Sequence, residues 1–89
     1  MKKRFDEVHF SPEHRYSLGI DRKVNGFYLA IPVSNGVVDY DEHYVLTREQ
    51  YESFLADEEV ALNFVERCRR RENDDLLIYE PGTNRGTPV

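Results

Sequence analysis

Apolar and polar residues alternate along three stretches of the first half of the chain, at 16–22, 27–33 and 37–46. Alternation with a period of two predicts strands that have one buried and one open face. Two Asn-Gly dipeptides, Asn25-Gly26 and Asn35-Gly36, separate the three stretches. Asn-Gly accepts the positive φ angles of a type I′ turn, so each dipeptide predicts a two-residue hairpin turn. The pattern therefore predicts a three-stranded antiparallel meander.

The two turns set a register for this meander. The first turn pairs Ile20 with Ile31, and the second pairs Ile31 with Tyr40. Both turns place one set of residues on a single apolar face: Leu18, Ile20, Phe27, Leu29, Ile31, Val33, Val38, Tyr40 and Tyr44. A slip of one residue would invert every side chain, so this agreement supports the register. Two residues fit it poorly. Pro32 cannot donate to the ladder and predicts a bulge or an early strand end, and Glu42 falls on the apolar face, where it should lie at the rim or turn outward at a bulge.

The second half of the chain has helical spacing. Thr47-Arg48-Glu49-Gln50 reads as a capping box that begins a helix at about 48–56. Asp57 caps a second helix at about 58–72, whose apolar stripe is Ala61, Phe64, Val65 and Cys68. The apolar run 76–79 predicts a fourth strand. We therefore expect an α+β fold of two layers, a mainly antiparallel sheet in the order β-β-β-α-α-β with two helices packed on one face.

Size and composition indicate a single domain and disfavour several classes of function. The 89 residues suit one domain, 1–89, in which the N-terminal segment 1–15 and the tail 81–89 are peripheral. The net charge of −5 disfavours non-specific binding to nucleic acid or anionic lipid. One cysteine, Cys68, allows no internal disulfide and no thiolate zinc site. No stretch approaches the ~20 apolar residues of a membrane span, and no apolar run follows Lys2-Lys3-Arg4. We expect a cytoplasmic protein that needs no cofactor.

The open face of the meander is the main candidate site. The register displays on it Asp21, Tyr28, Ala30, Asp39, Asp41 and His43. From residue 39 to residue 59 there are eight acidic residues and one basic residue, Arg48. Such a field would steer a basic partner onto this surface, whereas the alternative is an ordinary solvated sheet face. The expected partner-binding residues are Asp21, Tyr28, Asp39, Asp41, Glu42 and His43.

Other candidate chemistry is weaker. Asp41 and His43 point the same way, but no nucleophile is placed beside them, so we expect no enzymatic activity. His9, His14 and His43 match no metal-ligand spacing, so we expect no metal. The arginines around Cys68 encircle the end of the second helix instead of lining one face, which favours support of the helix dipole over RNA binding.

Three strings carry a resemblance to a protein family: IPVSNGVVDY at 31–40, DDLLI at 74–78 and PGTNRGTP at 81–88. With its size and acidic charge, the whole chain resembles the small stand-alone immunity proteins that accompany bacterial polymorphic and contact-dependent inhibition toxins. The resemblance implies no catalysis. It implies tight binding to one cognate toxin domain, often a basic nuclease, by covering its active site or an adjacent surface.

Two other functions stay open. The chain could be an adaptor or regulatory subunit of a larger assembly, which an exposed apolar patch beside the acidic surface would favour. It could also be a small enzyme or nucleic-acid binder, which a deep pocket around Asp41 and His43 would favour. A purely polar acidic patch on a stable monomer would favour the toxin inhibitor, and we expect the free protein to be a monomer or weak dimer.

Overall fold

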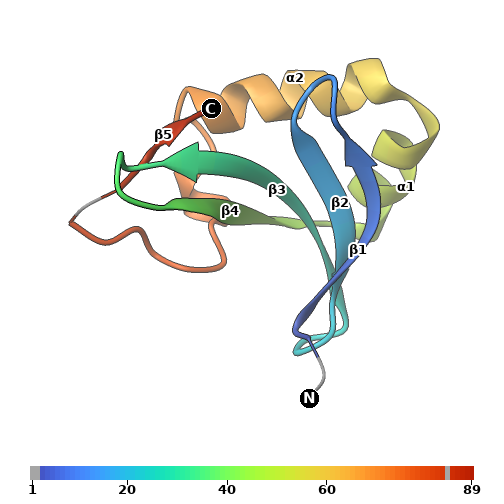
Figure 1. Ribbon diagram of the computed structural model, residues 1–89. Coiled ribbons are helices and arrows are strands. Elements are labelled where there is room, and N and C mark those ends of the chain that lie inside the picture. Colours follow the sequence, from blue (N-terminus) through green and yellow to red (C-terminus); the bar gives the residue numbers. More distant parts are fainter. Residues whose placement is uncertain (1–2, 84) are drawn as a thin grey trace.

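The computed structural model describes residues 3–83 and 85–89; Met1, Lys2 and Asn84, and the expectations that rest on them, lie outside the described residues. Four antiparallel strands come first and two helices follow (Figure 1). The strands are β1 (Phe5–Ser11), β2 (Tyr16–Asp21), β3 (Gly26–Ser34) and β4 (Asp39–Leu46). The helices are α1 (Arg48–Ala56) and α2 (Glu58–Arg69), and a 3-10 turn η1 (Asp74–Leu76) and a short strand β5 (Thr87–Pro88) complete the chain. The predicted α+β class is confirmed.

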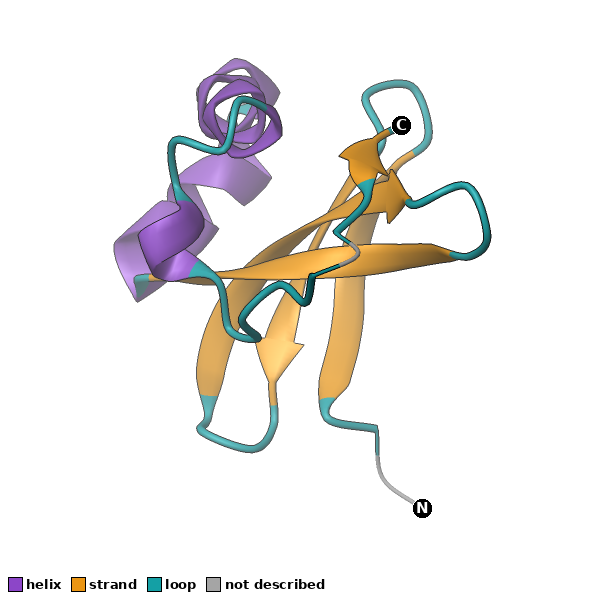
Figure 2. Cartoon of the chain, turned by 90° about the vertical axis from the view of Figure 1, so that its left-hand side faces the viewer, coloured by secondary structure: helices purple, strands orange, loops and turns teal. Residues whose placement is uncertain are grey.

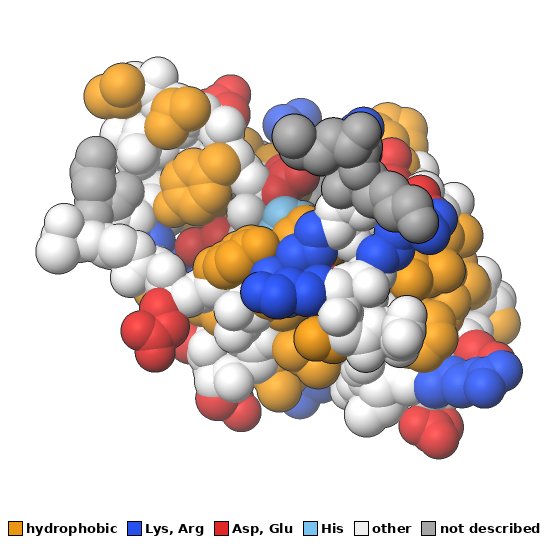
Figure 3. Space-filling view, turned by 90° about the horizontal axis from the view of Figure 1, so that it is seen from below, with side chains coloured by type: hydrophobic (Ala, Val, Ile, Leu, Met, Phe, Trp, Pro, Cys, Tyr) orange, Lys and Arg blue, Asp and Glu red, His pale blue; other side chains and the backbone are white. Residues whose placement is uncertain are grey.

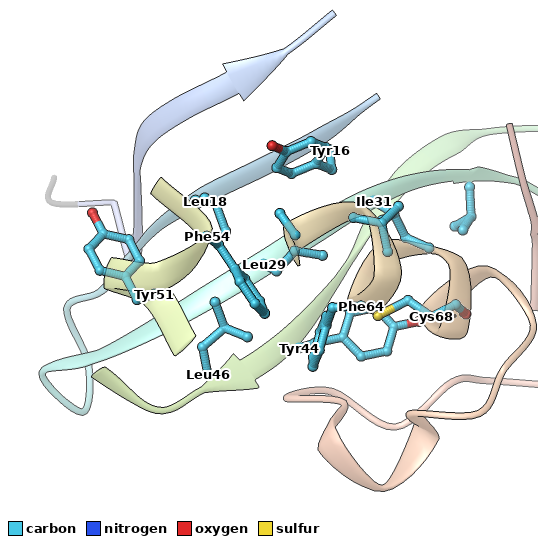
Figure 4. Packing of buried hydrophobic residues seen from close by; sticks show 13 residues of the cluster. Tyr16, Leu18, Leu29, Ile31, Tyr44, Leu46, Tyr51, Phe54, Phe64 and Cys68 are labelled. Atoms are coloured by element: carbon cyan, nitrogen blue, oxygen red, sulfur yellow. Dashed lines mark hydrogen bonds between the residues drawn. The ribbon is translucent and has the colours of Figure 1, made fainter. Parts of the chain in front are cut away.

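The molecule has two layers. The strands are ordered β1-β2-β3-β4, and β5 pairs with the end of β3. Both helices lie on one side of the sheet (Figure 2), as predicted. Between the layers, Leu29, Ile31 and Tyr44 from the sheet form one buried cluster with Phe54 and Phe64 from the helices (Figure 4). No helix among the described residues is both long and apolar enough to cross a membrane.

The helices begin where the sequence predicts. The Thr47 hydroxyl accepts a hydrogen bond from the Gln50 amide at 3.1 Å, and the Gln50 side chain accepts one from the Thr47 amide at 2.9 Å. Asp57 caps α2 by accepting from the Glu59 amide. The whole predicted stripe of α2 is buried: Ala61, Phe64, Val65 and Cys68. The capping residues and the helical period thus place both helices correctly.

The strand register differs from the predicted one, although the buried face is nearly the same. The first loop spans 22–25, so Ile20 lies opposite Phe27 instead of Ile31. The second loop spans 35–38, so Ile31 lies opposite Glu42 instead of Tyr40. These shifts of four and two residues are even, and an even shift leaves each side chain on its original face. Val38 is the exception, because the longer second loop leaves it exposed.

The two Asn-Gly dipeptides behave differently. In the first, Asn25 has a φ of 52°, but Gly26 has no positive φ and begins β3. In the second, Gly36 has a φ of 88°, and the Asn35 side chain accepts hydrogen bonds from the amides of Val37 and Val38 at 3.0 and 2.9 Å. Because the Asn35 side chain folds the loop, four residues replace the predicted two-residue turn.

We expect Gly36→Val to lower the free energy of unfolding by about 1–2 kcal/mol, because a β-branched residue is strained at positive φ. Gly36→Asn should cost less. Gly26→Val is the matched control, since a Cβ at Gly26 meets only a Val24 methyl group at 3.4 Å. Urea unfolding of the three variants measures the difference. Equal midpoints for the two Gly36 variants would contradict the positive φ at this loop.

Pro32 causes neither a bulge nor an early strand end, so that prediction is wrong. It lies opposite Asp41, and the β3–β4 register runs through it without a shift. Its nitrogen faces the side on which β2 has already ended, since the last β2–β3 pair is Ser17 with Ala30. On that side the Pro32 carbonyl accepts a hydrogen bond from the Val89 amide at 3.2 Å. The ladder therefore loses no hydrogen bond at Pro32.

The predicted fourth strand at 76–79 is wrong. The chain forms η1 there and then makes a single bridge between Leu77 and Tyr44. Leu76 and Leu77 pack against the core, so apolar burial, and not strand pairing, explains this run of residues. The sheet is completed from the two ends of the chain, by β1 and by β5.

Candidate functional site

The face of the sheet opposite the helices is concave, because the sheet is strongly curled. Phe5 on β1 stacks on His43 on β4, with ring centroids 3.8 Å apart, although two strands lie between them. In a flat sheet, strands that far apart would be separated by about 14 Å. Gly19 permits the curl: a Cβ there would lie 2.3 Å from the backbone oxygen of Asp6 and 2.6 Å from the Tyr28 hydroxyl. Only glycine allows the backbone of β1 to come this close.

The curl buries most of the face that was predicted to be open. Asp21, Tyr28 and Ala30 are each 2% exposed, so the expectation that they are displayed to a partner is wrong. His43 is half-buried, whereas Asp39 and Asp41 are exposed as expected. The prediction assumed a sheet face open to solvent, but β1 covers one half of it.

Asp21 is part of a buried ion pair. Arg4 donates to both of its carboxylate oxygens, at 2.9 and 3.0 Å, and the Lys23 amide donates at 3.1 Å. The hydrogen bonds from Arg4 hold the pKa of Asp21 below its usual range. Asp21 therefore fixes the start of β1 and is not free to bind a partner.

Glu42 is also occupied, on the helix side of the sheet. It is 7% exposed and neither lies at the rim nor turns outward at a bulge, so both alternatives are wrong. Arg85 from the tail donates to its two oxygens at 2.8 and 2.9 Å, and the same guanidinium donates to Asp74 at 2.7 and 3.0 Å. Glu42 thus anchors the tail.

Aromatic side chains fill one end of the concave face. The ring of Phe5 contacts those of Tyr28, His43 and Tyr79, and the rings of Tyr28 and His43 also contact each other. Burial, followed by the nearby carboxylates of Glu7, Asp41 and Asp6, raises the pKa of Tyr28 to about 12. Burial lowers the pKa of His43, so its imidazole is neutral at pH 7. The Nδ1 atom of His43 is buried without a hydrogen-bond partner among the described residues.

Two openings remain on this side of the molecule. Figure 3 shows the molecule from below, with a recess bordered by hydrophobic, acidic and basic side chains. The first, "the hollow", has a volume of about 250 Å³ and is lined by Glu7, Phe10, Pro12, Arg15, Tyr16, Ser17, Ala30, Pro32 and Asp41. The second, "the groove", has a volume of about 420 Å³ and runs between β4 and the following loop, lined by Tyr40, Asp41, Glu42, His43, Tyr79, Glu80, Pro81, Gly82 and Thr83. Asp41 lines both, so its carboxylate lies where the hollow and the groove meet.

The carboxylates of the hollow lack a cation of their own. Within residues 3–83 and 85–89, neither Glu7 nor Asp41 has an ion-pair partner, although both are exposed. Arg15, the cation of this lining, donates instead to the backbone oxygen of Val89 at 3.1 Å. The floor is apolar, built from Ala30 and Pro32. Such an arrangement suits a side chain with an aliphatic stem and a positive end.

The acidic stretch 39–59 does not form one surface. Asp39 and Asp41 lie on β4, on the concave side, while Glu42 is neutralised by Arg85. The other acidic residues follow the end of β4, in the helix layer: Glu49, Glu52, Asp57, Glu58 and Glu59. Asp39 and Asp41 are therefore the part of this stretch that can act together with the hollow.

The groove brings two of the residues considered for catalysis together. Asp41 and His43 share it with the hydroxyl-bearing Thr83, and its lining includes neither serine nor cysteine. Cys68 is buried in the core, and burial raises the pKa of its thiol to about 12. In the described part of the chain, no group of three or more potential ligands could hold a metal ion.

Sequence reasoning missed the contribution of the first 15 residues to the site. Glu7 and Phe10 come from β1, and Pro12 and Arg15 come from the loop that follows it. Gly19 was the available signal, because a glycine inside a strand often marks the close approach of another backbone.

Comparisons with family models, curated proteins and solved structures find no match for this chain. The site is described by its own chemistry: a carboxylate at the junction of two openings, an apolar floor and exposed aromatic rings. Phe10, which lines the hollow, is 53% exposed, and Tyr79, which lines the groove, is 56% exposed. Exposed aromatic side chains of this kind are enriched at protein–protein interfaces.

Proposed function

We propose that this chain is a non-catalytic binding protein that docks a basic protein partner on its concave face. The observation that carries the proposal is the pair of exposed carboxylates, Glu7 and Asp41, that line a largely apolar hollow and have no ion-pair partner among the described residues. A lysine or arginine side chain of a partner would place its stem on Ala30 and Pro32 and its charge between the two carboxylates. The net charge of −5 adds a long-range attraction to such a partner.

The resemblance to bacterial immunity proteins suggests which partner this chain binds and why. On this resemblance the partner is a cognate toxin domain with a basic surface, and the chain neutralises it by covering that surface. The exposed Asp39 and Asp41 would then guide the encounter, because exposed interface charges act mainly on the association rate.

A second candidate is a subunit of a larger assembly. Phe10 lines the hollow together with Glu7 and Asp41 and is 53% exposed, and Val8 on the same strand is 52% exposed. Exposed apolar patches often mark an interface with another protein. As such a subunit, the chain would bind a basic partner that is not a toxin.

Affinity capture from the cells that produce the chain tests the proposal. The wild type should retain a basic protein that Asp39→Lys/Asp41→Lys loses and that a control, Glu49→Lys/Glu59→Lys, retains. The control changes the net charge equally but at exposed helix residues that form no ion pair within residues 3–83 and 85–89. Retention of the partner by both charge variants would contradict docking on the concave face.

Expression of the captured partner alone then separates the two candidates. A toxin domain should stop growth, and co-expression of the wild-type chain should restore it, whereas the Asp39→Lys/Asp41→Lys variant should not. A partner that leaves growth unchanged would reject the immunity function and favour the assembly subunit.

A further inference from the structure

The outer edge of β4 has backbone groups to which no described residue of the chain bonds. In an antiparallel strand, successive residues direct their N–H and C=O groups to alternate sides. His43 directs its carbonyl away from β3, where the oxygen accepts from the Ile78 amide at 2.9 Å. By alternation, Asp41 and Asp39 also direct their backbone groups away from β3. At Asp41 this agrees with its neighbour across the ladder, Pro32, which has no N–H to give.

The chain itself begins to pair with this edge and then leaves it. Leu77 bridges Tyr44 in antiparallel fashion, and Ile78 bonds to His43. Beyond this point the chain diverges through Pro81 and Gly82, which leaves the groove of about 420 Å³ beside β4. The space next to Asp41 and Asp39 is thus where the next strand would lie.

The opposite edge of the sheet is less suited to accept a strand. β1 contains a register shift between Glu7 and His9, with Val8 as the extra residue. Bulges of this kind disrupt the pattern of donors and acceptors and protect an edge from pairing. The β4 register continues from Asp39 to Leu46 without a shift.

We infer that an extended segment of a basic protein partner adds to the sheet at the outer edge of β4, in the groove. Its backbone pairs with Asp39 and Asp41, and a lysine or arginine of the segment meets the Asp41 carboxylate. The inference rests on the proposed function, and it names the way in which the partner binds. The carboxylate of Glu80, on the far wall of the groove, adds to the attraction for a cationic segment.

Charge complementarity selects this occupant over a second copy of the chain. Antiparallel pairing of two β4 edges would bring Asp39 and Asp41 of one copy close to the same carboxylates of the other. Like charges across a strand pair are destabilising. The acidic edge therefore opposes self-association and accepts a basic strand.

A synthetic peptide is a suitable probe: a heptapeptide of alternating lysine and valine with blocked ends, titrated into the full chain and followed by amide NMR shifts. The largest shifts should fall on Asp39, Asp41 and His43, at the outer edge of β4. Asp41→Pro removes the outward N–H without removing a bond to β3, and Asp41→Asn keeps that N–H but removes the charge. Because the N–H contributes one hydrogen bond, Asp41→Pro should bind about 3–10-fold more weakly than Asp41→Asn.

A second test does not depend on the folding of Asp41→Pro. It uses two versions of the peptide, one N-methylated at the odd positions and one at the even positions. Only one of the two should lose binding, because strand addition uses alternate backbone groups. Equal binding by both methylated peptides, or shifts centred on the hollow or β1, would overturn strand addition. Absence of wild-type binding would overturn it as well.

The remaining outcomes separate this inference from the function on which it rests. If the Pro and Asn variants bind equally and both bind more weakly than the wild type, the Asp41 carboxylate acts but strand addition is rejected. If neither variant binds more weakly than the wild type, both the inference and docking at Asp41 are rejected. A dimer in sedimentation that Asp41→Pro abolishes would overturn the inference in favour of self-pairing.

Discussion

Replacement of Arg85 by alanine should lower the free energy of unfolding by about 3–5 kcal/mol, the cost of leaving a buried charge without its partner. Arg85 is 12% exposed and holds Glu42 and Asp74 through four hydrogen bonds. Its loss leaves the carboxylate of the buried Glu42 side chain without its cation. For a domain whose total stability is about 5–15 kcal/mol, this is a large share. Urea unfolding measures it.

A double variant separates the buried charge from the loss of packing. Arg85→Met with Glu42→Leu removes both charges and keeps apolar volume, so it should be clearly more stable than Arg85→Ala, because buried ion pairs can often be replaced by apolar pairs. A loss below about 1 kcal/mol in Arg85→Ala would show that the tail does not neutralise Glu42, since exposed ion pairs contribute about that much at most.

The second large effect is expected in the core. Ile31→Ala should cost about 2–5 kcal/mol, because the side chain is buried at the centre of β3, among residues from both layers. Val37→Ala is the matched control: Val37 is 90% exposed, so its truncation should change stability by less than about 0.5 kcal/mol. Thermal or urea unfolding compares the two. Similar losses in both variants would place Ile31 outside the core and contradict the assigned face.

The two faces of the sheet could be predicted from the sequence, but the strand pairs could not. The period-two pattern alone decides the face on which Leu29 and Ile31 lie. This assignment stays correct when the predicted register is wrong by two or four residues. The pairs depend on loop length. At the second turn, the Asn35 side chain bonds to the amides of Val37 and Val38 and lengthens the loop, which the dipeptide alone does not reveal.

The candidate site was harder to predict, because it depends on contacts between distant parts of the chain. Asp41 and Asp39 are exposed as expected, since they alternate with buried residues on β4. Asp21 and Tyr28 are buried because the sheet curls at Gly19 and brings β1 over them. Glu42 is buried because Arg85, 43 residues later in the chain, reaches it. Gly19 is the one local signal of the curl, because a glycine inside a strand often marks the close approach of another backbone, whereas the contact between Glu42 and Arg85 has no local signature in the sequence.

The most direct test of docking on the concave face is the association rate of the captured partner with the chain, measured at several salt concentrations. Asp39→Lys/Asp41→Lys should fold like the wild type, because both positions are exposed and unpaired in the described residues. It should associate at least about tenfold more slowly at low salt, with a weaker dependence on salt, while Glu49→Lys/Glu59→Lys should resemble the wild type more closely. If the variant at Asp39 and Asp41 associates at the wild-type rate with the same salt dependence, the partner does not dock on the concave face.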